Sequence, residues 1–322
     1  MPGVRRMAAA AALLVAAACT SGSTTPQTTE PPPSQPASSP SGTDDWTSGA
    51  AIPSSAIVIS IDGELSAVRP DGRGVPVMLT NVTAHGLGAY EPAWSPDGER
   101  LAFVVARPDH VHDHAGDGAI YVMAADGSSL ARLTPHVDAA QPAWSPDGDR
   151  IAFVRGQGQE MVVMDAEGSH QRVIARAAHY YQSPTWSPDG RWIAYQSNHP
   201  ADSEYLSVFA VHPDGTGAHE IHGGGKPAWS PDGRIAIAFA TGAAGIWIGR
   251  PDGRLRRITW CHLPCTDDLD PSWAPDGSAV AFTRQYGNRF HLAVVDLATG
   301  RVTESLQNLS KELSDAPAWR PV

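Results

Sequence analysis

Three histidines in alternate positions are the first candidate metal ligands in the chain. His110, His112 and His114 are separated by single residues, and Asp109 and Asp113 stand among them. In an extended segment, residues two apart point to the same side, so the three imidazoles could bind Zn²⁺ or Cu²⁺ together. The sequence fixes no fourth ligand, whereas structural zinc sites usually have a closed set, so a polar loop without metal is the alternative. A divalent metal at this loop is a hypothesis, and we predict no other cofactor.

The first 18 residues are typical of a signal peptide. Arg5 and Arg6 precede an apolar run at 7–18, which is shorter than the roughly 20 residues that span a bilayer as a helix. The run ends in three alanines and Cys19, and this resembles the lipobox of bacterial lipoproteins. The resemblance implies that Cys19 carries the lipid and that the protein is extracytoplasmic and anchored to the cell membrane. Secretion without lipid is the alternative.

Residues 19–51 are mostly Ser, Thr, Pro, Gly and Gln. Such a composition cannot bury enough apolar surface to offset the entropy lost on ordering, so we expect a disordered tether. Beyond it lie the other two cysteines, Cys261 and Cys265, four residues apart. In an exported chain such a pair predicts a short disulfide, although the sequence Cys-His-x-x-Cys could instead contribute to a metal site.

A repeat of about 45 residues fills the chain from residue 52 to residue 322. Its marker is a tryptophan that follows a proline and a small residue and precedes Ser-Pro-Asp-Gly or a close variant. These tryptophans are Trp94, Trp144, Trp186, Trp229, Trp273 and Trp319. The rings are expected to fill the gaps between repeats.

Each repeat contains further strand-length runs separated by turns. The runs after the Pro-Asp-Gly turn are 101–105, 151–154, 192–195, 235–239 and 280–282, and the next are 120–123, 161–164, 206–211, 246–248 and 292–295. With a short third run after an Asp-Gly turn, this order predicts a four-stranded antiparallel meander. Residues 56–80 hold three such strands and 316–321 hold the one they lack. We therefore predict an all-β, six-bladed β-propeller in which both termini close one blade.

The repeated Pro-x-Trp-Ser-Pro-Asp-Gly, followed by Ile-Ala-Phe and then by Tyr-Val-Met-x-x-Asp-Gly, resembles the WD40-like repeat of the TolB-type propeller family. The resemblance covers residues 56–322. It implies the propeller fold, whereas related propellers serve as envelope scaffolds, as gates on serine peptidases and as ligand-binding modules.

The two ends of such a propeller should differ. One end carries the tight Asp-Gly turns, and we call it the turn face. The other carries the irregular loops and interblade connections, and we call it the connection face, where function is more often found. The residue before each Pro-x-Trp should lie at the mouth of the central channel on the connection face; these channel-mouth residues are Glu91, Gln141, Ser183, Lys226, Asp270 and Ala316.

The channel mouth contains two acids and one lysine, a poor cage for a divalent ion, although Asp267 and Asp268 could add ligands for calcium. We expect a partner to bind at the connection face. The candidate residues are Tyr90, Glu91, His179, Tyr180, Tyr181, Lys226, Asp267, Asp268 and Asp270. Tyr90, Tyr180, Tyr181 and Asp268 are expected to be exposed loop side chains. The tyrosines with Trp260 could alternatively stack on sugars, as in a carbohydrate-binding module.

The charge of the chain limits its partners. It has 23 basic and 34 acidic residues, a net charge of −11, which argues against nucleic acid. Motifs for a serine hydrolase, a zinc protease, a P-loop or a dinucleotide site are absent from the sequence. We therefore predict a non-enzymatic, monomeric propeller that binds an envelope protein or peptide. A metal-dependent lyase or lactonase with a channel site is the alternative.

Overall fold

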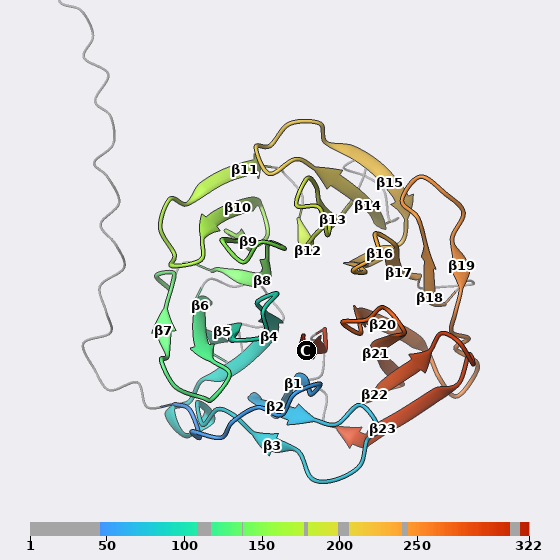
Figure 1. The fold of residues 1–322 in the computed structure, drawn as a ribbon, viewed down its shortest axis with the longest axis horizontal. Coiled ribbons are helices and arrows are strands. Elements are labelled where there is room, and N and C mark those ends of the chain that lie inside the picture. Colours follow the sequence, from blue (N-terminus) through green and yellow to red (C-terminus); the bar gives the residue numbers. More distant parts are fainter. Residues whose placement is uncertain are drawn as a thin grey trace, which may run out of the picture. The chain divides into compact units, whose positions relative to one another are not determined.

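The computed structural model describes residues 46–107, 117–136, 138–176, 180–198, 206–239, 244–309 and 316–321. These residues form six four-stranded antiparallel sheets around a central channel, which confirms the six-bladed propeller (Figure 1). One short 3-10 helix, Thr83–His85, lies among the described residues. No helix in these ranges is long and apolar enough to cross a membrane.

The blades follow one another in sequence. Blade 1 contains β4 (Gly88–Trp94), β5 (Arg100–Ala106), β6 (Ala119–Ala124) and β7 (Ala131–Arg132). Blade 2 contains β8 (Ala140–Trp144), β9 (Arg150–Arg155), β10 (Glu160–Asp165) and β11 (Arg172–Arg176). Blade 3 contains β12 (Gln182–Trp186), β13 (Ile193–Asn198), β14 (Leu206–Val211) and β15 (His219–Gly223). Blade 4 contains β16 (Gly225–Trp229), β17 (Ile235–Phe239), β18 (Gly245–Gly249) and β19 (Arg256–Arg257). Blade 5 contains β20 (Asp267–Trp273), β21 (Ala279–Tyr286), β22 (Arg289–Asp296) and β23 (Val302–Leu309).

Blade 6 is built from both ends of the propeller. Its strand order is β24 (Ala318–Trp319), β1 (Ile57–Ile61), β2 (Glu64–Val68) and β3 (Val77–Met78). Trp319 pairs with Ile57 and Ala318 pairs with Val58. The predicted closure is confirmed, and it gives β1 a hydrogen-bonded neighbour on the channel side.

The core lies between the blades rather than in one centre. Because each sheet packs against a sheet on either side, its middle strands are buried on both faces and read as continuous apolar runs. In β5 only the first of seven residues is not fully buried, whereas the outer strand β3 is exposed. Six clusters of buried side chains fill the six junctions. Among the described residues, the junction of blades 3 and 4 has the smallest, with four fully buried members.

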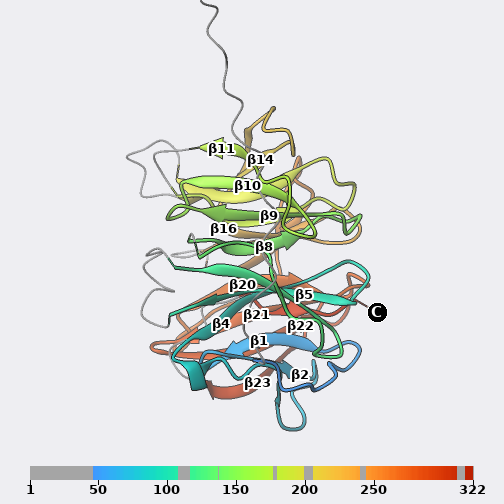
Figure 2. The ribbon, with the colours of Figure 1, turned by 90° about the vertical axis from the view of Figure 1, so that its left-hand side faces the viewer.

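The Pro-Asp-Gly turns have the geometry that their residues predict. In blade 1, Gly98 has a φ of 67° and its N–H donates to the carbonyl of Ser95 at 2.9 Å. The Ser95 hydroxyl donates to Asp97 and accepts the N–H of Arg100, which joins the two strands. The hydrogen bond from Ser95 holds the pKa of Asp97 below its usual value. Seen from the side, the strands run across the ring and the loops emerge at its two ends (Figure 2).

Contacts with the propeller begin before the predicted boundary. The Trp46 ring lies 5.4 Å from the ring of Tyr121, and the Ser48 N–H donates to the carbonyl of Leu79 at 2.9 Å. Ile52 is buried. Residues 46–51, which we expected to belong to the tether, therefore pack along blades 6 and 1. Residues 1–45, including Cys19, lie outside the described ranges.

Candidate functional site

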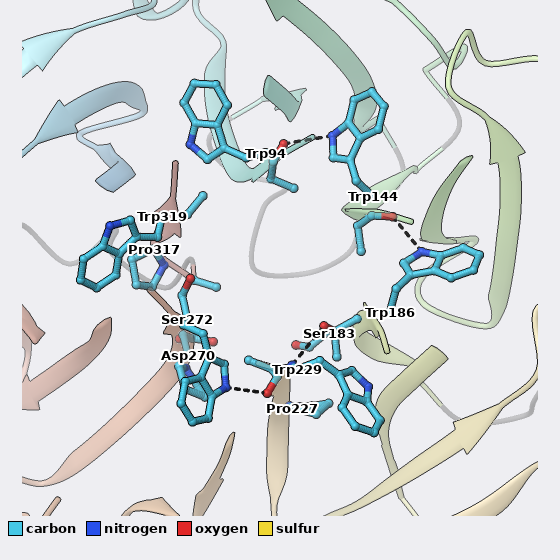
Figure 3. A pocket seen from close by; sticks show the side chains of 18 of the residues that line it. Trp94, Trp144, Ser183, Trp186, Pro227, Trp229, Asp270, Ser272, Pro317 and Trp319 are labelled. Carbon is cyan, nitrogen blue, oxygen red and sulfur yellow. Dashed lines mark hydrogen bonds between the residues drawn. The ribbon is translucent and has the colours of Figure 1, made fainter. Parts of the chain in front are cut away.

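The inner strands enclose a channel cavity of about 410 Å³. Its wall contains the repeated prolines and tryptophans, and all six channel-mouth residues line it. Figure 3 shows Trp94, Trp144, Trp186, Trp229 and Trp319 around the cavity, together with Ser183 and Asp270. Three of the indoles tie neighbouring blades together, since each donates its Nε1–H to a carbonyl of the preceding blade: Trp144 to Ala93, Trp186 to Ala143 and Trp273 to Ala228, at 3.0–3.1 Å. The tryptophans thus shape the cavity and join the blades.

Five of the channel-mouth residues have a left-handed backbone, which the sequence did not indicate. Their φ values lie between 51° and 55°; they are Glu91, Gln141, Ser183, Lys226 and Asp270. Each lies at an irregularity in the pairing of its inner strand with the next strand. This backbone costs a residue with a Cβ roughly 1–2 kcal/mol, so glycine would be the least strained choice at all five positions. The chain instead places a polar or charged side chain there each time.

Hydrogen bonds connect successive blades at the channel mouth. The Gln141 N–H donates to Glu91 Oε2 at 2.6 Å, and the Ser183 N–H donates to Gln141 Oε1 at 2.7 Å. At the next position Gln196 of β13 takes this role: its Oε1 accepts the Lys226 N–H at 2.9 Å. Sequence reasoning missed Gln196, because the predicted run ended at 195 whereas β13 continues to Asn198.

The charges of the channel mouth lie close together. Lys226 Nζ is 3.0 Å from Asp270 Oδ1, and the Asp270 side chain is only 6% exposed. Burial raises the pKa of Glu91, and the hydrogen bond from Gln141 and the positive charge of Lys226 only partly offset this. Lysine therefore opposes the two acids, as expected, in a site that can recognise both charged and polar groups.

Three of the predicted binding residues are not accessible. We expected Tyr90, Tyr181 and Asp268 to be exposed, and this was wrong: they are 3%, 8% and 0% exposed. The inner strands begin at earlier residues than we predicted. Tyr90 therefore lies in β4 and Asp268 in β20, rather than in the loops before these strands. The Tyr181 ring packs edge-on against Tyr195, 5.3 Å away.

The remaining predicted residues have varied positions. Tyr180 and Trp260 are 52% and 56% exposed on the connection face. Asp267 is partly buried in β20, and burial and the charge of Asp268 raise its pKa. His110, His112, His114 and His179 lie outside the described residues.

Asp268 belongs to a buried ion-pair network that the sequence did not reveal. Arg284 Nε and Nη2 donate to the two Asp268 carboxylate oxygens at 2.7 and 2.9 Å, and Arg284 Nη1 donates to Glu304 at 3.1 Å. Glu304 also accepts the Tyr286 hydroxyl at 2.8 Å and lies 3.1 Å from His291 Nδ1. These groups hold β20, β21, β22 and β23 together, so Asp268 has a structural role.

Cys261 and Cys265 form a disulfide in the connection between blades 4 and 5, just before β20. The loop that they close exposes Leu263. Among the described residues, Cys261, Cys265 and Asp268 are the one group of possible metal ligands that lie within reach of one another. Both sulfurs are in the disulfide and Asp268 binds Arg284, so these three residues do not fit a metal ion.

The comparisons with known proteins agree with this architecture. A model of the TolB β-propeller domain matches residues 139–322, more than half of the chain. No curated protein matches the sequence. Among solved structures, TolB from Acinetobacter baumannii is 20% identical with a TM-score of 0.63; the match covers 83% of this chain and 66% of that one, so the chain spans slightly less than two thirds of that TolB.

Two further solved structures show how widely the fold is used. A chain of a nidogen/laminin complex is 11% identical with a TM-score of 0.62, over 83% of this chain and 98% of that one. An oligogalacturonate lyase in complex with manganese is 15% identical with a TM-score of 0.50, over 79% and 74%. At these identities the likeness concerns the fold alone.

Proposed function

Because the chain belongs to the TolB β-propeller family, we propose that its propeller is a non-enzymatic scaffold that binds an envelope protein or peptide at the channel mouth. The exposed rings of Tyr180 and Trp260 on the same face provide additional contact area.

The observation that carries the proposal is the conformation of the channel mouth. Five side chains are retained on left-handed backbone, at a cost to stability that glycine would avoid. Since folding raises the pKa of Glu91, its ionised form also lowers the stability of the fold at neutral pH. Glu91 and Gln141 use part of their side chains for interblade hydrogen bonds, and Lys226 pairs with Asp270. The five side chains also present polar and charged groups to the channel cavity, as recognition of a partner requires.

Neutralising one charge pair tests this site. The double variant Lys226→Met/Asp270→Asn removes both charges of the pair. Glu91 loses the positive charge of Lys226 but also the negative charge of Asp270, and it keeps the hydrogen bond from Gln141, so stability should change little. We expect it to retain less than about one tenth of the partner that wild-type protein captures from an envelope fraction, a loss of ~1.4 kcal/mol or more. Capture is measured by quantitative mass spectrometry, and stability by thermal unfolding.

The matched control lies on the turn face. Arg69 and Asp71 form an exposed pair there, at 3.3 Å, and Arg69→Met/Asp71→Asn removes the same two charges. This variant should capture the partner as wild type does. Equal capture by both double variants would contradict the proposal. A stoichiometric divalent metal in the purified protein, lost in Glu91→Gln/Asp270→Asn, would support a channel lyase or lactonase instead.

The proposed scaffold is held at the outer surface of the cell membrane by a lipid on Cys19, which follows the short apolar run and three alanines. Replacing Cys19 by alanine should move the protein from the membrane fraction to the soluble fraction, because a mature chain without acyl groups lacks the buried hydrocarbon that anchors it. Fractionation with immunoblotting measures the change. Unchanged membrane association and gel mobility in the variant would show that Cys19 is not the anchor.

A further inference from the structure

Four of the six blade junctions contain the same arginine–tryptophan pair on the side of the turn face. The guanidinium carbon lies 4.5–5.1 Å from the centre of a repeat tryptophan in the next blade, a distance typical of cation–π contacts. The pairs are Arg100 with Trp144, Arg150 with Trp186, Arg234 with Trp273 and Arg320 with Trp94. The same packing of a guanidinium on a repeat tryptophan therefore occurs at four junctions.

Three of these arginines also bind the turn that follows the tryptophan. Arg100 and Arg234 donate through Nη2, and Arg320 donates through Nε. The acceptor each time is the carbonyl of the glycine that ends the Pro-Asp-Gly turn, at 3.0–3.1 Å. Stacking and the hydrogen bond to the glycine carbonyl together define a guanidinium site.

At the junction of blades 3 and 4 no arginine that the structure describes stacks on the repeat tryptophan, although Arg250 Nη1 lies 3.9 Å from the position that a Cβ on Gly233 would take. Trp192 stands where blades 1 and 2 have Arg100 and Arg150, two residues after the turn glycine. Its ring stacks on His212 of its own blade, with centroids 3.7 Å apart, and meets His219 edge-on. Within the described ranges, no arginine or lysine lies over the Trp229 ring.

The Trp229 ring is only partly buried, as is that of Trp319. The Trp229 Nε1–H has no hydrogen-bond partner among the described residues, a feature it shares with Trp94, so only the absence of a stacked arginine distinguishes it from Trp94. A cavity of about 500 Å³, which we call the 3/4 notch, opens beside Trp229. The residues that form the notch include Trp192, Trp229, Pro188, Pro231, Asp189 and Arg250. This is also the junction with the smallest buried core among the described residues.

We propose that the 3/4 notch binds an arginine side chain of a partner protein, with its guanidinium stacked on Trp229 and donating to the carbonyl of Gly233. Trp229 and the turn Ser230-Pro231-Asp232-Gly233 supply the same parts that hold the chain's own arginines at the other junctions. The site lies on the turn face and does not depend on the function proposed for the channel mouth.

The stacking surface and the carbonyl of the notch favour arginine over other side chains. Asp189 and Asp232 line it, and Asp232 is already paired with Arg234 at 2.9 Å, so Asp232 adds little attraction for a further guanidinium. A planar guanidinium can stack on an indole and donate to a carbonyl at once, whereas a lysine ammonium cannot stack in this way. Arg250 borders the notch from blade 4 and opposes a second cation, so we expect binding of a single side chain to be weak, in the millimolar range.

Tryptophan indole resonances provide a direct test. The full chain, labelled with ¹⁵N in its tryptophans, is titrated with N-acetyl-arginine amide and, as a control, with N-acetyl-citrulline amide, which has nearly the same shape without the charge. We expect saturable shifts of the Trp229 and Trp192 indole signals with the arginine compound only. The signals of Trp144, Trp186 and Trp273 should not move, because each already carries its own arginine.

Variants distinguish binding in the notch from binding elsewhere on the protein. Trp192→Arg restores the arginine of the repeat. Its side chain should occupy the site and weaken binding of the arginine compound at least tenfold. If this variant does not fold, Trp229→Leu removes the stacking surface and should weaken binding equally. Arg250→Ala should bind more tightly than wild type, because a like charge is removed.

Four results would overturn the proposal. They are the absence of a shift at Trp229, equal shifts with the citrulline compound, undiminished binding by Trp192→Arg or Trp229→Leu, and binding by Arg250→Ala but not by wild type. The last would mean that Arg250 itself closes the notch.

Discussion

Replacing Asp268 by alanine is expected to lower the free energy of unfolding by about 3–5 kcal/mol, because it leaves a buried guanidinium without its carboxylate. The Asp268 side chain is fully buried and that of Arg284 is 10% exposed. Burial alone would lower the pKa of Arg284, but the hydrogen bonds and charges of Asp268 and Glu304 raise it in the wild type. In the variant Glu304 remains, and a guanidinium does not lose its proton in proteins, so Arg284 stays ionised. Urea-induced unfolding followed by tryptophan fluorescence measures the loss.

The control replaces both partners of this pair. Asp268→Leu/Arg284→Met removes both charges and fills the space with apolar groups, so it should recover most of the stability lost in Asp268→Ala. If the double variant is no more stable than Asp268→Ala, packing rather than the unpaired charge explains the loss. An Asp268→Ala variant with wild-type stability would contradict the network outright.

Acid should weaken the same network. Burial raises the pKa of Glu304, but the hydrogen bonds from Tyr286, His291 and Arg284 outweigh it and bring the pKa below the usual 4.5. A carboxyl whose folded pKa is lowered contributes stability that is complete well above its unfolded pKa and is lost as the pH falls below it. Glu304 therefore stabilises the fold at neutral pH, and this contribution is lost in acid.

The fold could be read from the sequence because its determinants are local and repeated. Trp94, Trp144 and their counterparts mark each blade, and Pro-Asp-Gly marks the turn that follows. Because the repeats share these signals, each predicts the same antiparallel meander. The closure of blade 6 followed from counting strands at the two ends. The 235–239 strand was predicted to the residue as β17.

The site was less predictable because it depends on contacts between distant residues. The positions of Glu91, Lys226 and Asp270 at the channel mouth follow from the repeat, but their left-handed backbone does not. Asp268 is a charged residue after a polar loop, and its burial depends on Arg284, sixteen residues later in another strand. Nothing in the local pattern distinguishes such a carboxylate from an exposed one.

Removal of residues 316–322 is expected to lower the free energy of unfolding by about 5 kcal/mol or more, since it exposes β1 and removes Trp319, a large ring whose loss alone typically costs about 3–5 kcal/mol. The strand that disappears is β24, whose Trp319 packs with the buried cluster between blades 5 and 6. Thermal unfolding should show one transition at a lower temperature, because the ring loses its closure as a unit.

The single substitution Arg320→Met tests the contacts between blade 6 and blade 1 without removing the C-terminal segment. Arg320 stacks on Trp94 of blade 1, donates to the Gly98 carbonyl at 3.1 Å and donates to the carbonyl of Ile52, so it joins blade 6 to blade 1 and to the N-terminal segment. Methionine keeps an unbranched apolar stem but loses these interactions, and we expect the substitution to cost about 2 kcal/mol. Val75→Ser, an exposed substitution on blade 6, is the control and should change stability by less than about 0.5 kcal/mol. A truncated chain with the melting temperature of the full chain would contradict closure by β24. If the truncation lowers stability but Arg320→Met does not, the loss is due to strand pairing and Trp319 alone.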